Sequence, residues 1–247
     1  MEQRERADIL GCQVDLVTLE QGVDLVKDLV KRNQPAQVIT LNAEMVFQAQ
    51  SEPYLRQIIN QADLVTPDGI GIVWGGRQLG HAVPERVAGI DLLQKICARA
   101  PREGWKIYLL GSAPGVAEEA AQQLRRSYPG IEICGIQHGY FQNAELPEIV
   151  NAIQGTTPHI VFVGLGAPKQ ELWIKEHGPQ LGTPVCIGVG GSLDVIAGHK
   201  KRAPRWIIRI NLEWLYRLYS EPSRWRRQLV LPKFVLLILR KKINRSR

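Results

Sequence analysis

Residues 105–128 read WKIYLLGSAPGVAEEAAQQLRRSY, and this stretch decides the fold class. An apolar run, Trp105–Leu110, leads through a Gly/Pro turn into a helix with apolar residues at helical spacing, Val116–Tyr128. Apolar runs at His159–Gly164 and Val185–Val189 are likewise followed by a glycine-containing turn and a helix. Strands that alternate with helices indicate a mostly parallel sheet covered on both faces. We therefore predict an α/β fold with Rossmann-like sheets.

The preceding hundred residues contain similar elements in a less regular order. The expected strands are Asp8–Cys12, Gln37–Leu41 and Ala62–Thr66, and the expected helices are Val23–Val30, Asn42–Gln50, Leu55–Gln61 and Ile90–Ala100. At the other end of the chain, residues 204–247 differ in composition, being basic and rich in Trp. We expect this segment to be a separate helical appendage.

Composition limits which classes of protein the sequence fits. A hydrophobic content of 45% supports a folded core. No apolar run reaches the roughly 18 residues of a membrane-spanning helix, and the charged N-terminus does not resemble a secretion signal. The four cysteines form no CxxC pair, as expected of reduced, buried thiols. These features predict a cytoplasmic protein.

Charge is divided unevenly along the chain. Residues 199–247 contain 15 Lys and Arg but only two acidic residues, a net charge of +13, whereas residues 1–198 carry −6. Such a tail is expected to meet an anionic surface: phospholipid, nucleic acid or an acidic partner. Its interleaved Trp, Leu and Ile residues favour an interfacial helix on anionic lipid over a nucleic-acid arm. A helix packed onto the core is the alternative interpretation.

Three glycine-rich loops follow predicted strands: Gly111–Gly115, Gly164–Gln170 and Gly188–Ser192. Parallel sheets bind ligands beyond the carboxyl ends of their strands, and helix N-termini there attract phosphate. Gly111, Gly166 and Gly191 are therefore candidate substrate-binding residues, although each glycine could simply turn the chain. None of these loops matches the dinucleotide fingerprint or a P-loop, which disfavours an NAD(P)-dependent oxidoreductase.

Polar residues gather at the same predicted sheet edge. Asp68, between Pro67 and Gly69, is either a turn aspartate or a carboxylate that accepts a hydroxyl proton as general base. Thr40 and Asn42 are either a strand-end Thr and a helix N-cap or ligand contacts.

Two further side chains have both a structural and a functional interpretation. Arg86 either pairs with neighbouring Glu85 or clamps a diphosphate, and Gln170 either decorates a first helical turn or donates to a ligand oxygen. The five histidines show no metal spacing, and neither D-x-D nor G-x-S-x-G occurs. We therefore expect neither a metal site nor serine-hydrolase chemistry.

Several of these segments together resemble the WecG/TagA/CpsF glycosyltransferases. They occur in that family's order, at Thr40–Glu44, Thr66–Gly71, Arg86–Asp91, Gly164–Glu171, Gly188–Asp194 and Arg202–Pro204. The resemblance implies two α/β halves around a cleft, at residues 1–100 and 101–203, the second binding a nucleotide. Residues 204–247 then form the membrane-associating appendage.

The resemblance also implies a reaction. An inverting transferase of this type moves a sugar, N-acetylmannosamine or its uronic acid, from a UDP-sugar to a polyprenyl-diphosphate-linked N-acetylglucosamine, without a metal or other cofactor. Asp68 matches the proposed general base, and Thr40, Asn42, Arg86 and Gln170 match residues of the substrate pocket.

In the tail, the resemblance assigns three arginines to the departing UDP: Arg217, Arg224 and Arg227. It places the enzyme peripherally on the inner face of the cell membrane, with no nucleic acid as partner. A UDP-glucose or UDP-galactose transferase, a non-catalytic nucleotide-binding protein and a nucleic-acid-binding protein remain as alternatives. The sequence leaves the oligomeric state open, a homo-oligomer included.

Overall fold

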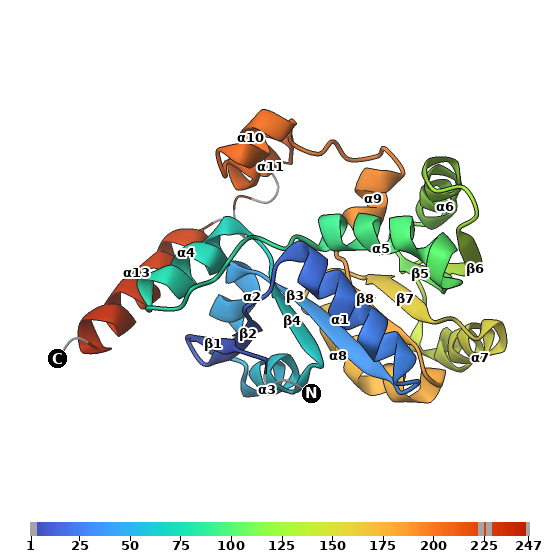
Figure 1. Ribbon diagram of the computed structural model, residues 1–247, viewed down its shortest axis with the longest axis horizontal. Helices are drawn as coiled ribbons and strands as arrows, with labels where there is room; N and C mark the ends of the chain where they lie inside the picture. Colours follow the sequence, from blue (N-terminus) through green and yellow to red (C-terminus); the bar gives the residue numbers. More distant parts are fainter. Residues whose placement is uncertain (1–3, 222–224, 226–228, 246–247) are drawn as a thin grey trace.

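Six parallel strands form the central sheet, in the order β4–β3–β8–β7–β5–β6 (Figure 1). Their bounds are β3 Ala36–Leu41, β4 Leu64–Pro67, β5 Lys106–Gly111, β6 Glu132–Gln137, β7 Ile160–Gly164 and β8 Val185–Gly188. The structure is a computed structural model and describes residues 4–221, 225 and 229–245 of the 247-residue chain. Pairing of β3 with β8 joins strands from residues 1–100 and 101–203 in one sheet.

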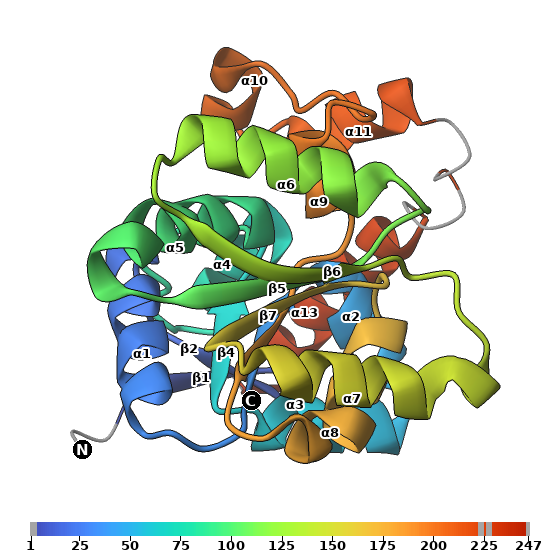
Figure 2. The same ribbon diagram turned by 90° about the vertical axis from the view of Figure 1, so that its right-hand side faces the viewer.

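Helices cover both faces of this sheet (Figure 2). One face packs against α1 Leu19–Lys31, α5 Gly89–Glu103, α6 Val116–Ser127 and α9 Ser192–Ile196. The other packs against α2 Ala43–Gln48, α3 Pro53–Gln61, α7 Leu146–Thr156 and α8 Lys169–His177, with short 3₁₀ turns at Asn143–Glu145 and Gly178–Leu181. Because both faces are covered, the central strands are continuous apolar runs. The predicted α/β class with a parallel sheet is confirmed.

An antiparallel hairpin precedes the sheet, formed by β1 Arg6–Ile9 and β2 Cys12–Asp15. Its turn residues, Leu10 and Gly11, have φ angles of 54° and 88°, as a tight hairpin turn requires. The single strand predicted over Asp8–Cys12 is therefore wrong, because the chain reverses within it. Buried Asp15 fastens the hairpin to the sheet, since its carboxylate accepts a hydrogen bond from the Val65 amide at 2.7 Å.

The C-terminal segment is helical where the structure describes it. It contains α10 Arg205–Arg209, α11 Glu213–Ser220 and α13 Val230–Arg245. Helix α13 packs against α2 and against α4 Ile70–Gln78, a helix that the sequence pattern left unassigned (Figure 1). Phe234 and Ile238 of α13 are buried in the same core cluster as residues of β1, β2, α2 and α3. The last helix is thus tied to the body through a hydrophobic core.

Glycines on α4 permit this contact. A Cβ atom at Gly75 would lie 3.1 Å from Phe234 Cζ and 3.3 Å from Ile238 Cδ1, both closer than ordinary packing allows. Gly71, one turn earlier, lies near Ala43 and Phe234. Among the described residues, no helix combines the length and apolarity that crossing a membrane would require.

Candidate functional site

A cavity of about 830 Å³ opens beyond the carboxyl ends of β3, β4, β7 and β8. Helices α11 and α13 contribute to its wall, so segments far apart in the sequence enclose it. It lies within the size range of small-molecule sites. The predicted site residues that line it are Thr40, Asn42, Asp68, Arg86, Gly166, Gln170, Gly191 and Arg217.

The remaining three predicted site residues are Gly111, Arg224 and Arg227. Gly111 ends β5 with φ 135°, and a Cβ atom there would lie 2.5 Å from the Gly164 backbone. Its lack of a side chain therefore serves the close approach of β5 to β7, and the structure does not bring it to the cavity. Arg224 and Arg227 lie outside the described residues.

Asp68 lies at the end of β4, where the chain turns into α4. Its backbone amide donates to the Leu41 carbonyl at 2.8 Å, and its Oδ2 accepts from the Gly89 amide at 3.3 Å. Burial in the cleft raises the pKa of Asp68 to about 6, although Arg217, the Gly89 amide and Arg86 pull it downward. A carboxylate with this pKa is largely ionised at neutral pH and still basic enough to accept a proton.

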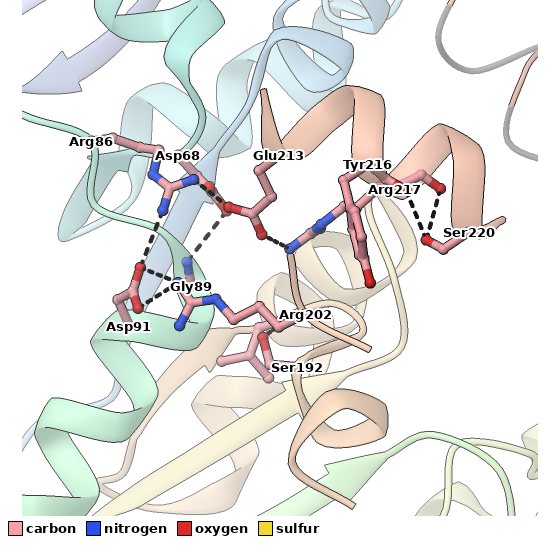
Figure 3. A network of polar contacts seen from close by, with 11 residues as sticks. Asp68, Arg86, Gly89, Asp91, Ser192, Arg202, Glu213, Tyr216, Arg217 and Ser220 are labelled. Atoms are coloured by element: carbon pink, nitrogen blue, oxygen red, sulfur yellow. Dashed lines mark hydrogen bonds and ion pairs between the residues drawn. The ribbon is translucent and has the colours of Figure 1, made fainter. Parts of the chain in front are cut away.

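One carboxylate of α11 joins two arginines beside Asp68 (Figure 3). Glu213 forms an ion pair with Arg86 through one oxygen and with Arg217 at 2.9 Å through the other. Burial alone would raise the pKa of Glu213, but these arginines lower it overall. Arg86 also contacts Asp91 at 3.4 Å. The tail is therefore attached to the body at the cavity by a network of charges.

Sequence reasoning did not identify Glu213. Its only signals are that it is one of two acidic residues in a segment with net charge +13 and that it precedes Arg217 by one helical turn. The partnership with Arg86 spans 127 residues and depends on the fold.

Thr40 and Asn42 both line the cavity, and each also forms a hydrogen bond that stabilises the elements around it. The Thr40 hydroxyl donates to the Gly188 carbonyl at 2.9 Å, which links the ends of β3 and β8. Asn42 caps α2, because its side-chain oxygen accepts from the Met45 amide at 3.0 Å. The N-cap interpretation of Asn42 is thus confirmed, and its position in the wall also leaves room for a ligand contact.

Both polar atoms of the Gln170 side-chain amide form hydrogen bonds that hold it in place. Its oxygen accepts from the Gly190 amide at 2.9 Å, and its nitrogen donates to Glu171 Oε1 at 2.8 Å. Glu171 is fully buried, and burial raises its pKa to about 7. A Cβ atom at Gly188 would lie 2.6 Å from the Gln170 nitrogen, so the glycine makes space for this arrangement.

Cations surround the polar side of the cavity. Lys200 and Arg202 line it together with Arg86 and Arg217, and sequence reasoning had not placed either as a site residue. Arg202 pairs with Asp91 at 2.6 Å, and Lys200 lies 3.5 Å from Asp194. Guanidinium and ammonium groups in this number suit a diphosphate. In the part of the chain that the structure describes, no group of three or more His, Cys, Asp or Glu residues is arranged to hold a metal ion.

Comparison with known proteins agrees with this geometry. The model of the glycosyl transferase WecG/TagA/CpsF family matches residues 7–247. The chain is 38% identical over 209 residues to a protein of Bacillus spizizenii named N-acetylglucosaminyldiphosphoundecaprenol N-acetyl-beta-D-mannosaminyltransferase, covering 85% of this chain and 80% of the relative.

Two other relatives carry the same name. The protein of Bacillus subtilis strain 168 is 35% identical over 222 residues, covering 90% of this chain and 86% of the relative. The protein of Staphylococcus aureus strain MRSA252 is 35% identical over 239 residues, covering 96% of this chain and 93% of the relative. The similarity therefore includes both the strand-end loops and the basic tail.

Proposed function

The chain belongs to the WecG/TagA/CpsF family of glycosyltransferases, and we propose that it transfers N-acetylmannosamine from UDP to undecaprenyl-diphosphate-linked N-acetylglucosamine. The names of the relatives supply the sugar and the acceptor. The observation that carries the proposal is the position of Asp68, in a cavity lined by Arg86 and Arg217. The product serves the synthesis of teichoic acid or another cell-surface polysaccharide.

Asp68 acts as general base in this proposal. A sugar hydroxyl is a weak nucleophile until a positioned carboxylate takes its proton during the attack. The acceptor oxygen then bonds to the anomeric carbon of the donor from the side opposite UDP, while the bond from that carbon to the UDP oxygen breaks. The proton passes to Asp68, the electron pair leaves with UDP, and the anomeric centre is inverted. A pKa of about 6 suits this step near neutral pH.

The departing UDP gains negative charge, which the cavity can stabilise. Arg86 and Arg217 are held near Asp68 by Glu213, and Lys200 and Arg202 approach from the β8 side. Preorganised cations of this kind stabilise charge that develops in a transition state. We therefore propose that the chain's own cations supply this charge, with no metal or other cofactor. Thr40, Asn42, Gln170, Gly166 and Gly191 are proposed to contact the donor.

The acceptor remains in a bilayer, so the enzyme must work at its surface. Exposed aromatic side chains accompany the basic residues of the C-terminal segment: Trp206, Tyr219 and Trp225 are 65%, 85% and 53% exposed. Aromatic rings at headgroup depth with surrounding Lys and Arg are typical of peripheral binding to anionic lipid. We propose that residues 204–247 hold the protein on the inner face of the cell membrane.

UDP release tests the reaction. Purified enzyme is given different UDP-sugars with or without N-acetylglucosamine diphosphate on a short lipid. We expect release from UDP-N-acetylmannosamine that depends on the acceptor. Turnover with UDP-glucose or UDP-galactose alone would contradict the assigned donor, and release without acceptor would contradict the transfer reaction.

Vesicle sedimentation tests the membrane contact. We expect binding to vesicles that contain phosphatidylglycerol, weaker binding to neutral phosphatidylcholine vesicles, and a loss when Trp206 and Tyr219 are both replaced by Ser. Exposed Tyr54 on α3, replaced by Ser, is the matched control because it is 58% exposed but lies outside the tail. Equal binding of all three proteins to both vesicles would contradict the proposal.

A further inference from the structure

The cavity has two chemically different sides. Its polar side, around β8 and α11, carries the cations described above. Its other side is formed by α2, α4 and α13 and is lined by Met45, Ile70, Trp74, Leu231, Phe234 and Val235. A sugar nucleotide carries few apolar groups, so the donor accounts for the polar side and leaves this apolar wall without a ligand.

Helix α13 extends the apolar wall out of the cavity. Phe234 and Ile238 are buried against the body, whereas Val235, Leu239 and Ile243 are 38%, 40% and 57% exposed. The exposed residues follow one another at intervals of four positions, so they lie along one side of the helix. From Val235 to Ile243 the helix rises about 12 Å. An apolar strip therefore begins at the wall of the cavity and leads outward.

The outer part of α13 is held to the body, which gives the strip a fixed position. Lys241 forms an ion pair with Asp8 of the hairpin, and Lys242 donates to Gln78 of α4. The inner part is fixed by the contact of Phe234 with Gly75. A ligand that follows the strip meets a surface that is already ordered, so binding requires little further ordering of the helix.

We propose that the isoprenoid chain of the acceptor binds this apolar wall, with its first units against Leu231 and Val235 and the next along Leu239. The inference rests on the proposed function, which brings the acceptor's sugar hydroxyl to Asp68 in the same cavity. The diphosphate and then the lipid follow this sugar directly, so the first isoprene carbons come close to the cavity. The apolar wall is the part of the cavity that suits them.

A bilayer alone does not account for the wall. Ile70, Trp74 and Leu231 line the cavity and are only partly exposed, so they are set back from the outer surface that a bilayer meets. A single flexible chain can enter where a bilayer cannot. Each CH₂ group that it buries is expected to strengthen binding by about fourfold.

The test separates the acceptor's own chain from the bilayer by omitting vesicles and detergent. Acceptors are N-acetylglucosamine diphosphates bearing methyl, geranyl or farnesyl groups, used below the concentration at which they form micelles. With UDP-N-acetylmannosamine as donor, we expect the acceptor KM of the unaltered enzyme to fall at least about tenfold from methyl to farnesyl. The donor KM should stay the same.

Variants of α13 locate the contact. Val235→Ser should remove most of the gain from the lipid, and Val235→Leu should keep it. Leu172→Ser on α8 is the matched control, because Leu172 is 36% exposed, close to the 38% of Val235, but neither lines the cavity nor belongs to α13. It should respond to the lipid as the unaltered enzyme does. Leu239→Ser should reduce only the step from geranyl to farnesyl.

The outcomes distinguish this inference from the proposed function. An acceptor KM that is the same for methyl and farnesyl, or an equal loss of lipid response in Val235→Ser and Leu172→Ser, would overturn the isoprenoid site while the transferase remained. Absence of turnover with every acceptor would overturn the proposed function itself. If Val235→Ser also changes the donor KM, its fold is damaged. The response of the acceptor KM to lipid length in Leu239→Ser then decides whether the isoprenoid site exists.

Discussion

Replacing Asp68 by Asn should strongly lower turnover and at the same time stabilise the folded protein. The ionised carboxylate is buried in the cleft, and this burial raises its pKa from 3.8 to about 6. Ionisation of Asp68 is therefore less favourable in the folded chain than in the unfolded one. Asn keeps an oxygen for the Gly89 amide but carries no charge. A group that assists catalysis is thus expected to reduce stability.

The size of the stability gain in Asp68→Asn follows from the pKa shift of Asp68. A change from 3.8 to about 6 corresponds to about 3 kcal/mol at most, at roughly 1.4 kcal/mol for each tenfold step. Local relaxation in the cleft reduces this to about 1–3 kcal/mol. For a chain of this size the melting temperature should rise by roughly 2–12 °C.

The stability difference between Asp68→Asn and the unaltered protein depends on pH. The folded state holds the Asp68 proton more tightly, so the unaltered protein loses stability as pH rises from about 4 to about 6, and Asp68→Asn does not. The melting temperatures of Asp68→Asn and the unaltered protein should be nearly equal at pH 4, and their difference should reach its full value at pH 7.5. Turnover should fall by about 10²–10⁴-fold, while UDP still binds.

Thermal melts across pH, UDP release and UDP binding together check this reasoning. Asp28→Asn on α1 is the control, because its carboxylate is 60% exposed and its replacement should change neither melting temperature nor turnover. A lower melting temperature of Asp68→Asn at pH 7.5, or retained turnover, would refute the assignment of a buried catalytic carboxylate.

Three further changes have predicted outcomes. Glu213→Gln should lower turnover by about tenfold and stability by about 2 kcal/mol, since both Arg86 and Arg217 lose a charged partner; kinetics and urea unfolding measure both. The lowered pKa of Glu213 means that this contribution is present at neutral pH and is lost as pH falls through its folded pKa. Glu171→Gln keeps an oxygen for Gln170 and removes a buried acid with pKa about 7, so its melting temperature should exceed that of the unaltered protein at pH 8 and match it at pH 4. Gly75→Val should displace α13 and lower the melting temperature, whereas Gly155→Ala in α7, where a Cβ meets no atom within 4 Å, should be neutral or stabilising by about 0.5–1 kcal/mol.

The sheet was predictable because its strands carry their signal locally. Apolar runs such as Trp105–Leu110 and His159–Gly164 become β5 and β7 with ends shifted by one residue or less. The hairpin turn was not predictable, since Leu10 adopts a positive φ that a Leu rarely takes. Helix α4 contains three glycines, and its stability comes from packing against β1 and α13. Neither feature is visible in a local pattern.

The site residues likewise divide into those with a local sequence signal and those whose position depends on the fold. Thr40 lies near the carboxyl end of β3, and Asp68 and Gln170 follow the ends of β4 and β7. The rule that parallel strands present ligands at their carboxyl ends gathers the three at one edge. Glu213 and Lys200 belong to segments whose position depends on how α11 and the loop after α9 fold back over the sheet. That return depends on contacts between residues more than 100 positions apart, such as Arg86 with Glu213. Local spacing cannot supply them.

Helix α11 brings Arg217 and Glu213 to Asp68 together, and the two have opposite effects on its pKa. Arg217 lowers the pKa of Asp68 and Glu213 raises it, while burial remains the largest cause of the shift. Covering the cavity therefore acts on Asp68 mainly by excluding water. Helix α13, which continues the same tail, packs on α2 and α4, the helices that follow Asn42 and Asp68. Displacing α11 would consequently change the exposure of Asp68 and the position of Arg217 in one step.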